Sequence, residues 1–159
     1  MHYPSMGDVE VSIQKVSPRL LAAVNRKVPF GQVGIFVRPA LDQVWAFLRA
    51  QSGLRTDGHN IFLYGHPKQR GEPMDVDFGV EVVRDFEATG EIKPVRTPAG
   101  EVATTLHIGP YEKMHPAHQA IRDWMAANHR ESGGWSWEIY GDWTEDPAKL
   151  ETTIMYLLK

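Results

Sequence analysis

Several short segments of the chain alternate hydrophobic and polar residues with a period of two. Val9, Val11 and Ile13, for example, are separated by polar residues, which is the pattern of a half-buried strand. The same reasoning, with Pro and Gly residues as boundaries, predicts further strands. They cover residues 20–28, 60–65, 75–83, 92–95, 102–108, 135–141 and 152–158.

Two other segments have the longer period of an amphipathic helix. Val44 and Leu48 belong to an apolar stripe with helical spacing. Pro39 is placed to open this helix, because the first turn of a helix does not need the N–H that proline lacks. We therefore predict one helix over residues 39–51 and, by the same signals, a second over residues 116–128.

The predicted elements occur twice in the same order. The dipeptide Pro39-Ala40 recurs as Pro116-Ala117, and the segment at 61–65 is matched by the segment at 137–141. Ordered matches at a nearly constant offset indicate a duplicated unit. The repeats cover about residues 9–83 and 91–159.

Two strand–helix–strand–strand units predict an α+β fold. We expect one domain over residues 1–159, in which antiparallel sheets lie side by side and both helices cover one face. A ligand cleft is expected between the two halves. In each half, the strand that follows the helix must pack one face onto that helix.

This packing, together with strand alternation, predicts which residues face the cleft. Ile61 and Leu63 would pack on the first helix, so Phe62 and Tyr64 would point the other way. By the same argument Trp137 and Ile139 would pack on the second helix. Glu138 and Tyr140 would then join the aromatic residues of the first half in the cleft.

Glu138 is the main candidate for chemistry. A carboxylate on an aromatic surface is unfavourable unless it is paired or its pKa rises. As an anion it could hold a lipophilic cation whose rings stack on aromatic faces. As a desolvated carboxyl near neutrality it could act as a general acid or base. The alternative is an ordinary solvent-facing glutamate on an edge strand.

Other candidates have a structural alternative of equal weight. Tyr111 lies in a break before the second helix, either close to the mouth of the cleft or in a structural turn. Trp143 follows the Glu138 strand and lines that mouth or caps the core. His115 and His118 could share a helix face, but no third ligand has convincing spacing, so neither a metal site nor a cofactor is predicted.

Composition restricts the class of partner. The formal charge is −3, with no cluster of Lys and Arg along a helix, which argues against specific binding of nucleic acid. The absence of cysteine excludes disulfides and thiolate chemistry. Neither a signal peptide nor an apolar segment of membrane length is visible. We therefore expect a cytoplasmic protein that does not bind membranes.

An ordered set of short motifs resembles the GyrI-like family, which shares its domain with the effector-binding domains of multidrug-sensing transcription activators. The set spans the chain from about Val9 to Lys159. It consists of Phe78-Gly79-Val80-Glu81-Val82, Pro98-Ala99-Gly100-Glu101, Leu106-His107-Ile108-Gly109-Pro110-Tyr111, Ile121-Arg122-Asp123-Trp124-Met125, Trp137-Glu138-Ile139-Tyr140 and Asp146-Pro147.

The resemblance implies a ligand cleft in which Glu138 matches a buried glutamate that meets cationic aromatic ligands. It also implies two further activities. Some stand-alone members hydrolyse cyclopropane-bearing DNA alkylators with a cleft glutamate and aromatic residues, which would make Glu138 and Tyr140 catalytic. The founding member inhibits DNA gyrase, so a protein-interaction module is the alternative. A DNA-binding helix-turn-helix is not expected, because the ligand domain already begins at Val9.

Overall fold

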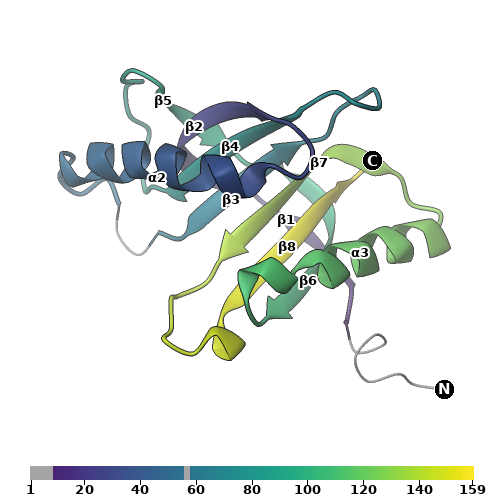
Figure 1. Cartoon of the computed structure of the whole chain (residues 1–159). Helices are drawn as coiled ribbons and strands as arrows, with labels where there is room; N and C mark the ends of the chain where they lie inside the picture. The colour runs from purple at the N-terminus through teal and green to yellow at the C-terminus, as the bar shows by residue number, and fades with distance from the viewer. Residues whose placement is uncertain (1–8, 56–57) are drawn as a thin grey trace.

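The computed structural model describes residues 9–55 and 58–159. Figure 1 shows their helices and strands in chain order. The strands are β1 (Ser12–Val16), β2 (Leu20–Val28), β3 (Asn60–Gly65), β4 (Met74–Glu81), β5 (Ile92–Arg96), β6 (Gly100–Ile108), β7 (Ser132–Tyr140) and β8 (Glu151–Leu158). The α-helices are α2 (Val33–Arg49) and α3 (His115–Ala127), and the short 3-10 helices are η1 (Tyr111–Lys113) and η2 (Pro147–Lys149).

The eight strands of the described residues form one antiparallel sheet rather than two sheets side by side. Their order is β1-β6-β8-β7-β3-β4-β2-β5. The pairing of β3 with β7 at the centre of the sheet joins β4, β2 and β5 on one side to β8, β6 and β1 on the other. In this pairing Phe62 lies directly opposite Glu138, so the two side chains share one face of the sheet.

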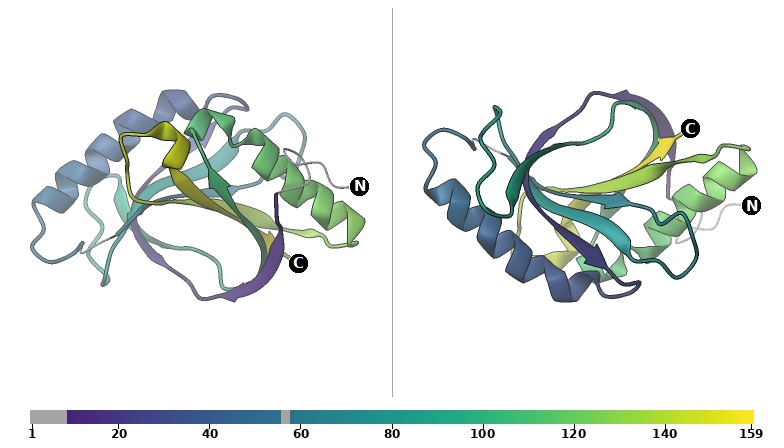
Figure 2. Two further views of the ribbon diagram at one scale, coloured as in Figure 1. Left: turned by 90° about the horizontal axis from the view of Figure 1, so that it is seen from below. Right: turned by 90° about the horizontal axis from the view of Figure 1, so that it is seen from above.

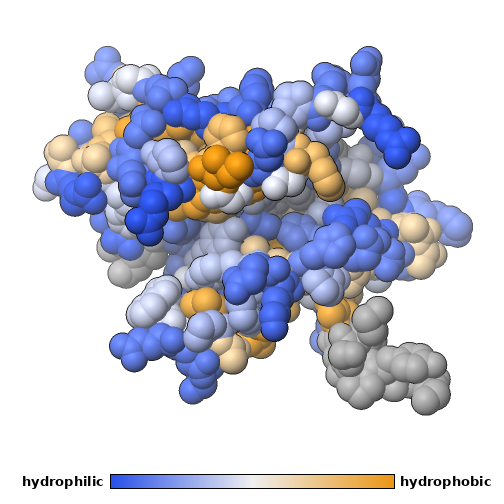
Figure 3. Space-filling model, in the orientation of Figure 1, coloured by the Kyte–Doolittle hydropathy of each residue, from blue (hydrophilic) through white to orange (hydrophobic). Residues whose placement is uncertain are grey.

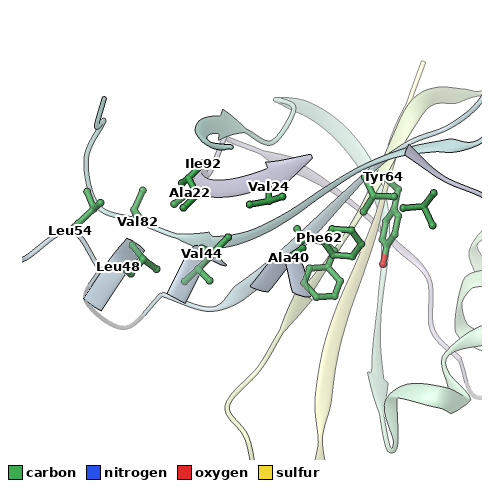
Figure 4. Close-up of a cluster of buried hydrophobic side chains, with 14 residues drawn as sticks. Ala22, Val24, Ala40, Val44, Leu48, Leu54, Phe62, Tyr64, Val82 and Ile92 are labelled. Atoms are coloured by element: carbon green, nitrogen blue, oxygen red, sulfur yellow. The ribbon is translucent and has the colours of Figure 1, made fainter. Parts of the chain in front are cut away.

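Both helices cover the same face. Ala40 and Val44 of α2 pack in one hydrophobic cluster with Phe62 and Tyr64 of β3, and Figure 4 shows these side chains together. On the other half of the sheet, Ile121 of α3 packs with residues of β6 and β8. The α+β class and the helices on one face are therefore as predicted.

The opposite face of the sheet is also buried, because the sheet is strongly curved. Leu21 of β2 and Val102 of β6 belong to one cluster, although four strands lie between β2 and β6 in the sheet. Trp137 at the centre of this cluster is 1% exposed. Figure 2 shows the sheet curving away from the helices, which brings its outer strands together on this second face.

Because the sheet is curved, the packing of β3 and β7 differs from the prediction. Ile61 and Leu63 do not pack on α2; they lie on the concave face with Trp137 and Ile139. Phe62 and Tyr64 point towards α2 instead. Alternation separates the two sets of residues correctly, but the assignment of faces is wrong, because the prediction assumed that only the face under the helices is buried.

The first residue of α2 also differs from the prediction. The helix begins at Val33, and Pro39 lies inside it rather than at its first turn. A proline inside a helix leaves one carbonyl of the preceding turn without its helical partner. The turn that precedes the helix contains Gly31 in a left-handed conformation, with φ of 80°, which glycine adopts without strain.

The other boundaries differ little from the prediction. The strand expected from Val9 begins three residues later, at Ser12, and β7 begins at Ser132 rather than at Trp135. Among the described residues, no helix is long and apolar enough to cross a membrane.

Candidate functional site

A large cavity of about 1260 Å³ lies on the helix-bearing face, between α2 and α3. Figure 3 shows the hollow between these helices, with apolar residues gathered along α2 above it. The cavity is lined by both halves of the chain. Its walls include Phe30, Val33, Tyr64, His66, Tyr111, His118, Arg122, Met125, Glu138, Tyr140 and Tyr156.

Glu138 lies on the floor of the large cavity and is 4% exposed. Its neighbours across the central strands are Phe62 of β3 and Ile154 of β8. This position contradicts the alternative of a solvent-facing glutamate on an edge strand, because β7 is a central strand. A buried carboxylate must be satisfied by hydrogen bonds or neutralised.

Three side chains satisfy the Glu138 carboxylate. The hydroxyls of Tyr64 and Tyr140 both donate to Oε1, each at 2.6 Å. The imidazole Nε2 of His118 lies 2.7 Å from Oε2. Burial raises the pKa of Glu138, but the hydrogen bond and charge of His118 and the two tyrosine hydrogen bonds outweigh it, so the pKa lies below its ordinary value.

The same contacts fix the protonation of the tyrosines. Burial, and then the negative charge of Glu138, raise the pKa of Tyr64 and of Tyr140 well above the ordinary value for tyrosine. Both hydroxyls therefore keep their protons at neutral pH and donate to the carboxylate. The floor of the cavity is therefore an ionised carboxylate that accepts from two neutral hydroxyls.

His118 belongs to a chain of hydrogen bonds that ends at Glu138. Its Nδ1 lies 2.7 Å from the Tyr156 hydroxyl, and Arg122 Nη1 donates to that hydroxyl at 3.1 Å. An ionised carboxylate can only accept hydrogen bonds, so Nε2 of His118 is the donor in this contact. The chain links Arg122 to the carboxylate through Tyr156 and His118.

Sequence reasoning missed this role of His118, although it placed the residue on the second helix. His118 and Arg122 are one turn apart on α3, and this spacing puts them on one face of a helix. That spacing was the available signal, but Glu138 is 20 residues further along the chain. Both imidazole nitrogens are engaged, and the described residues contain no group of three possible metal ligands.

His66 forms part of the wall beside this chain. Its Nε2 lies 2.8 Å from the Ser136 hydroxyl, and its ring packs near Tyr156. Burial lowers the pKa of His66, and the positive charges of His118 and Arg122 lower it further. A neutral His66 at physiological pH leaves the cavity without an additional cation at this position.

A small cavity of about 540 Å³ adjoins the large one. Its aromatic walls are Trp45, Phe62, Tyr111, Tyr140 and Trp143. Tyr111 and Tyr140 line both cavities. Their rings meet edge to face, with centroids 5.2 Å apart, and Tyr140 makes a similar contact with Phe62 at 4.8 Å.

The residues proposed from the sequence are thus divided between two cavities. Tyr64 and Glu138 line the large cavity, Phe62 and Trp143 line the small one, and the two shared tyrosines stand between them. Trp143 is 73% exposed, so it does not cap the core. Tyr111 lies in η1, just before α3, and is partly exposed.

The sequence of the chain matches the model of a known protein family over most of its length. The model of the GyrI-like small molecule binding domain matches residues 9–159. A search of curated proteins found no match.

Solved structures share the fold at low sequence identity. The C-terminal domain of EcmrR has a TM-score of 0.77 and 23% identity, over 96% of this chain and 98% of that one. SAV2435 bound to tetraphenylphosphonium has a TM-score of 0.63 and 14% identity, over 94% of each chain. A hydrolase from Listeria innocua has a TM-score of 0.63 and 13% identity, over 94% of this chain and 92% of that one.

Proposed function

Because the chain belongs to the GyrI-like family of small-molecule-binding domains, we propose that it binds flat apolar or cationic molecules in the large cavity as part of a drug or toxin response. The observation that carries this proposal is the ionised carboxylate of Glu138, 4% exposed on the floor of an aromatic cavity. A buried negative charge attracts a lipophilic cation strongly, because little water screens it.

The shape and composition of the large cavity support the same class of ligand. Tyrosine rings and apolar side chains surround the carboxylate, and aromatic faces stabilise cations and flat rings. One structural neighbour, SAV2435, was solved with tetraphenylphosphonium bound. That cation is therefore a suitable probe for this protein.

We also propose that the cavity lies between two copies of a duplicated unit. The strand order is mirrored about the β7–β3 pair, since β8 and β4 come next on either side, followed by β6 and β2. Phe62 and Glu138, which occupy equivalent positions in the two repeats, lie directly opposite each other. An approximate two-fold axis between them would relate the halves.

The test is a substitution that keeps volume and removes charge. Glu138→Gln should weaken tetraphenylphosphonium by about 10- to 150-fold, which corresponds to the ~1.5–3 kcal/mol of a hydrogen bond to a charged group. Neutral triphenylphosphine oxide should bind both forms with similar affinity. Isothermal titration calorimetry measures both ligands. Equal affinity of the two forms for the cation would show that the carboxylate is a bystander.

A second candidate function is hydrolysis of cyclopropane-bearing alkylators, which the hydrogen-bond chain to Glu138 favours. With its lowered pKa, Glu138 is ionised at neutral pH and would act as a base. It would take a proton from the water that attacks the strained ring, as a carbon–oxygen bond forms and a ring carbon–carbon bond breaks. The electron pair of the broken bond would move onto the conjugated carbonyl oxygen of the substrate, which then takes a proton from solvent. Tyr111 is the freer of the two candidate donors to the substrate carbonyl, because Tyr140 already donates to Glu138.

Product analysis separates this activity from simple binding. If the protein is a hydrolase, mass spectrometry should detect a ring-opened, hydrated product. Glu138→Gln should then reduce turnover about 100-fold or more, the usual contribution of one general base. The remaining alternative, a protein partner such as DNA gyrase, calls for a flat and filled cleft. The open volume beside Glu138 favours a small molecule.

A further inference from the structure

We propose that the small cavity is a second ligand site, which takes flat, uncharged aromatic molecules without using Glu138. This inference goes beyond the function proposed for the large cavity. The small cavity has a volume of about 540 Å³, which lies within the range of ~300–1,000 Å³ typical of small-molecule sites. It is therefore large enough for a molecule of two or three fused rings.

The walls of the small cavity are suited to flat rings. Trp45 of α2 and Phe62 of β3 contribute aromatic surface from two different elements, and Val37 and Leu41 add apolar surface from α2. Aromatic rings stack on such walls or meet them edge to face. A flat ligand can therefore contact several walls at the same time.

The charges of the small cavity argue against a charged ligand. Its described walls include Arg55, His59 and Asp142, but not Glu138. Arg55 already lies 4.6 Å above the Trp45 ring, and Asp142 Oδ1 lies 3.8 Å from His59 Nδ1. Among these described walls the formal charges of Arg55 and Asp142 cancel, so a charged ligand would lose water without gaining a net opposite charge from them.

Two tyrosine side chains separate the cavities. Tyr140 is held by its hydrogen bond to Glu138 at 2.6 Å and by edge-to-face contacts with Phe62 and Tyr111. A side chain fixed on several sides makes a stable partition. Ligands on its two sides should therefore bind together rather than compete.

Trp143 supplies the opening of the second site. This indole is 73% exposed at the rim of the small cavity. A ligand that covers this indole removes a large aromatic surface from water, which favours binding. Its exposure also means that replacing it should leave the core intact.

The experiment pairs a neutral dye with a cation. Equilibrium dialysis at pH 7.5 would measure 1-aminoanthracene, which is flat and uncharged, and tetraphenylphosphonium, separately and together. We expect each to bind in the presence of the other, with less than about a twofold change in affinity, because the fixed Tyr140 side chain stands between the two ligands. Mutual displacement with a combined stoichiometry of one would overturn the proposal.

Two exposed aromatic residues provide matched variants. Trp143→Ala should weaken the dye about tenfold and leave the cation within about twofold, since one aromatic contact is lost on one side only. Phe30 is 96% exposed and lines only the large cavity, so Phe30→Ala should have the opposite selectivity. Ile108→Ala, at an exposed position outside both cavities, should change neither affinity.

The outcomes for the two sites are distinguishable. If the dye binds and depends on Trp143 while the cation fails to bind, the second site stands and the function proposed for the large cavity fails. If the cation binds and the dye does not, the second site is wrong and the proposed function stands. If the dye binds but Trp143→Ala leaves its affinity unchanged, the second site is wrong, and the result for the cation alone decides the proposed function.

Discussion

His118 places its Nε2 atom 2.7 Å from Oε2 of Glu138, on the carboxylate oxygen that Tyr64 and Tyr140 leave free. Both oxygens of the carboxylate are therefore already engaged by side chains of the protein. A cationic ligand at the proposed site would share the carboxylate with these three side chains.

Tyr64→Phe should destabilise the protein through Glu138. Tyr64 is buried, and its hydroxyl donates to the carboxylate at 2.6 Å. The substitution keeps the ring in its cluster and leaves a buried anion with one donor fewer, so the free energy of unfolding should fall by about 1.5–3 kcal/mol. Urea denaturation measures it. Tyr111→Phe is the control, because Tyr111 is 37% exposed and its hydroxyl is not part of the buried cluster around Glu138, and it should change stability little.

The alternation of hydrophobic and polar residues predicts the strands more accurately than it predicts the functional site. The bounds of β2 and β3 follow from alternation and flanking residues, and they match the structure. Alternation also puts Phe62 and Tyr64 on one face. It cannot say which face the helix covers, because Ile61 and Phe62 are both buried, at 0% and 4% exposure.

The features that sequence analysis missed depend on long-range packing. The curvature of the sheet buries its second face, and no short segment encodes that curvature. His118 reaches Glu138 only because α3 docks on β6 and β8 through residues such as Ile121. The separation of the two cavities likewise depends on where Tyr111, from η1, meets Tyr140.

Acid should destabilise the protein partly through Glu138. Its pKa in the folded state lies below the ordinary value of 4.5. The stabilisation is therefore complete above about pH 4.5 and is lost as pH falls through the lower, folded-state pKa. Chemical denaturation between pH 6 and pH 3, on either side of an ordinary glutamate pKa, would follow this loss.

The comparison of wild type with Glu138→Gln isolates this contribution, because other acidic groups titrate in both proteins. The difference in unfolding free energy should change with pH below about 4.5, in the direction that removes the advantage of the wild type. His66, whose pKa is lowered by burial, has the same sign and should begin to reduce stability below its ordinary value of about 6.5 in both proteins. A difference that stays constant with pH would show that the pKa of Glu138 is not lowered.

At Tyr140, the ring and the hydroxyl should have separate effects on ligand binding. Its ring lines both cavities, and its hydroxyl contacts Glu138 in the large cavity. Tyr140→Phe keeps the partition, so 1-aminoanthracene should bind it as well as it binds wild type.

Tyr140→Ala removes the partition and a shared aromatic wall, so both probes should bind about tenfold more weakly because aromatic contacts are lost. The two probes should also begin to compete, because one merged volume replaces two. Dialysis with both probes measures each effect. Independent binding of both probes to Tyr140→Ala would show that Tyr140 does not divide the site.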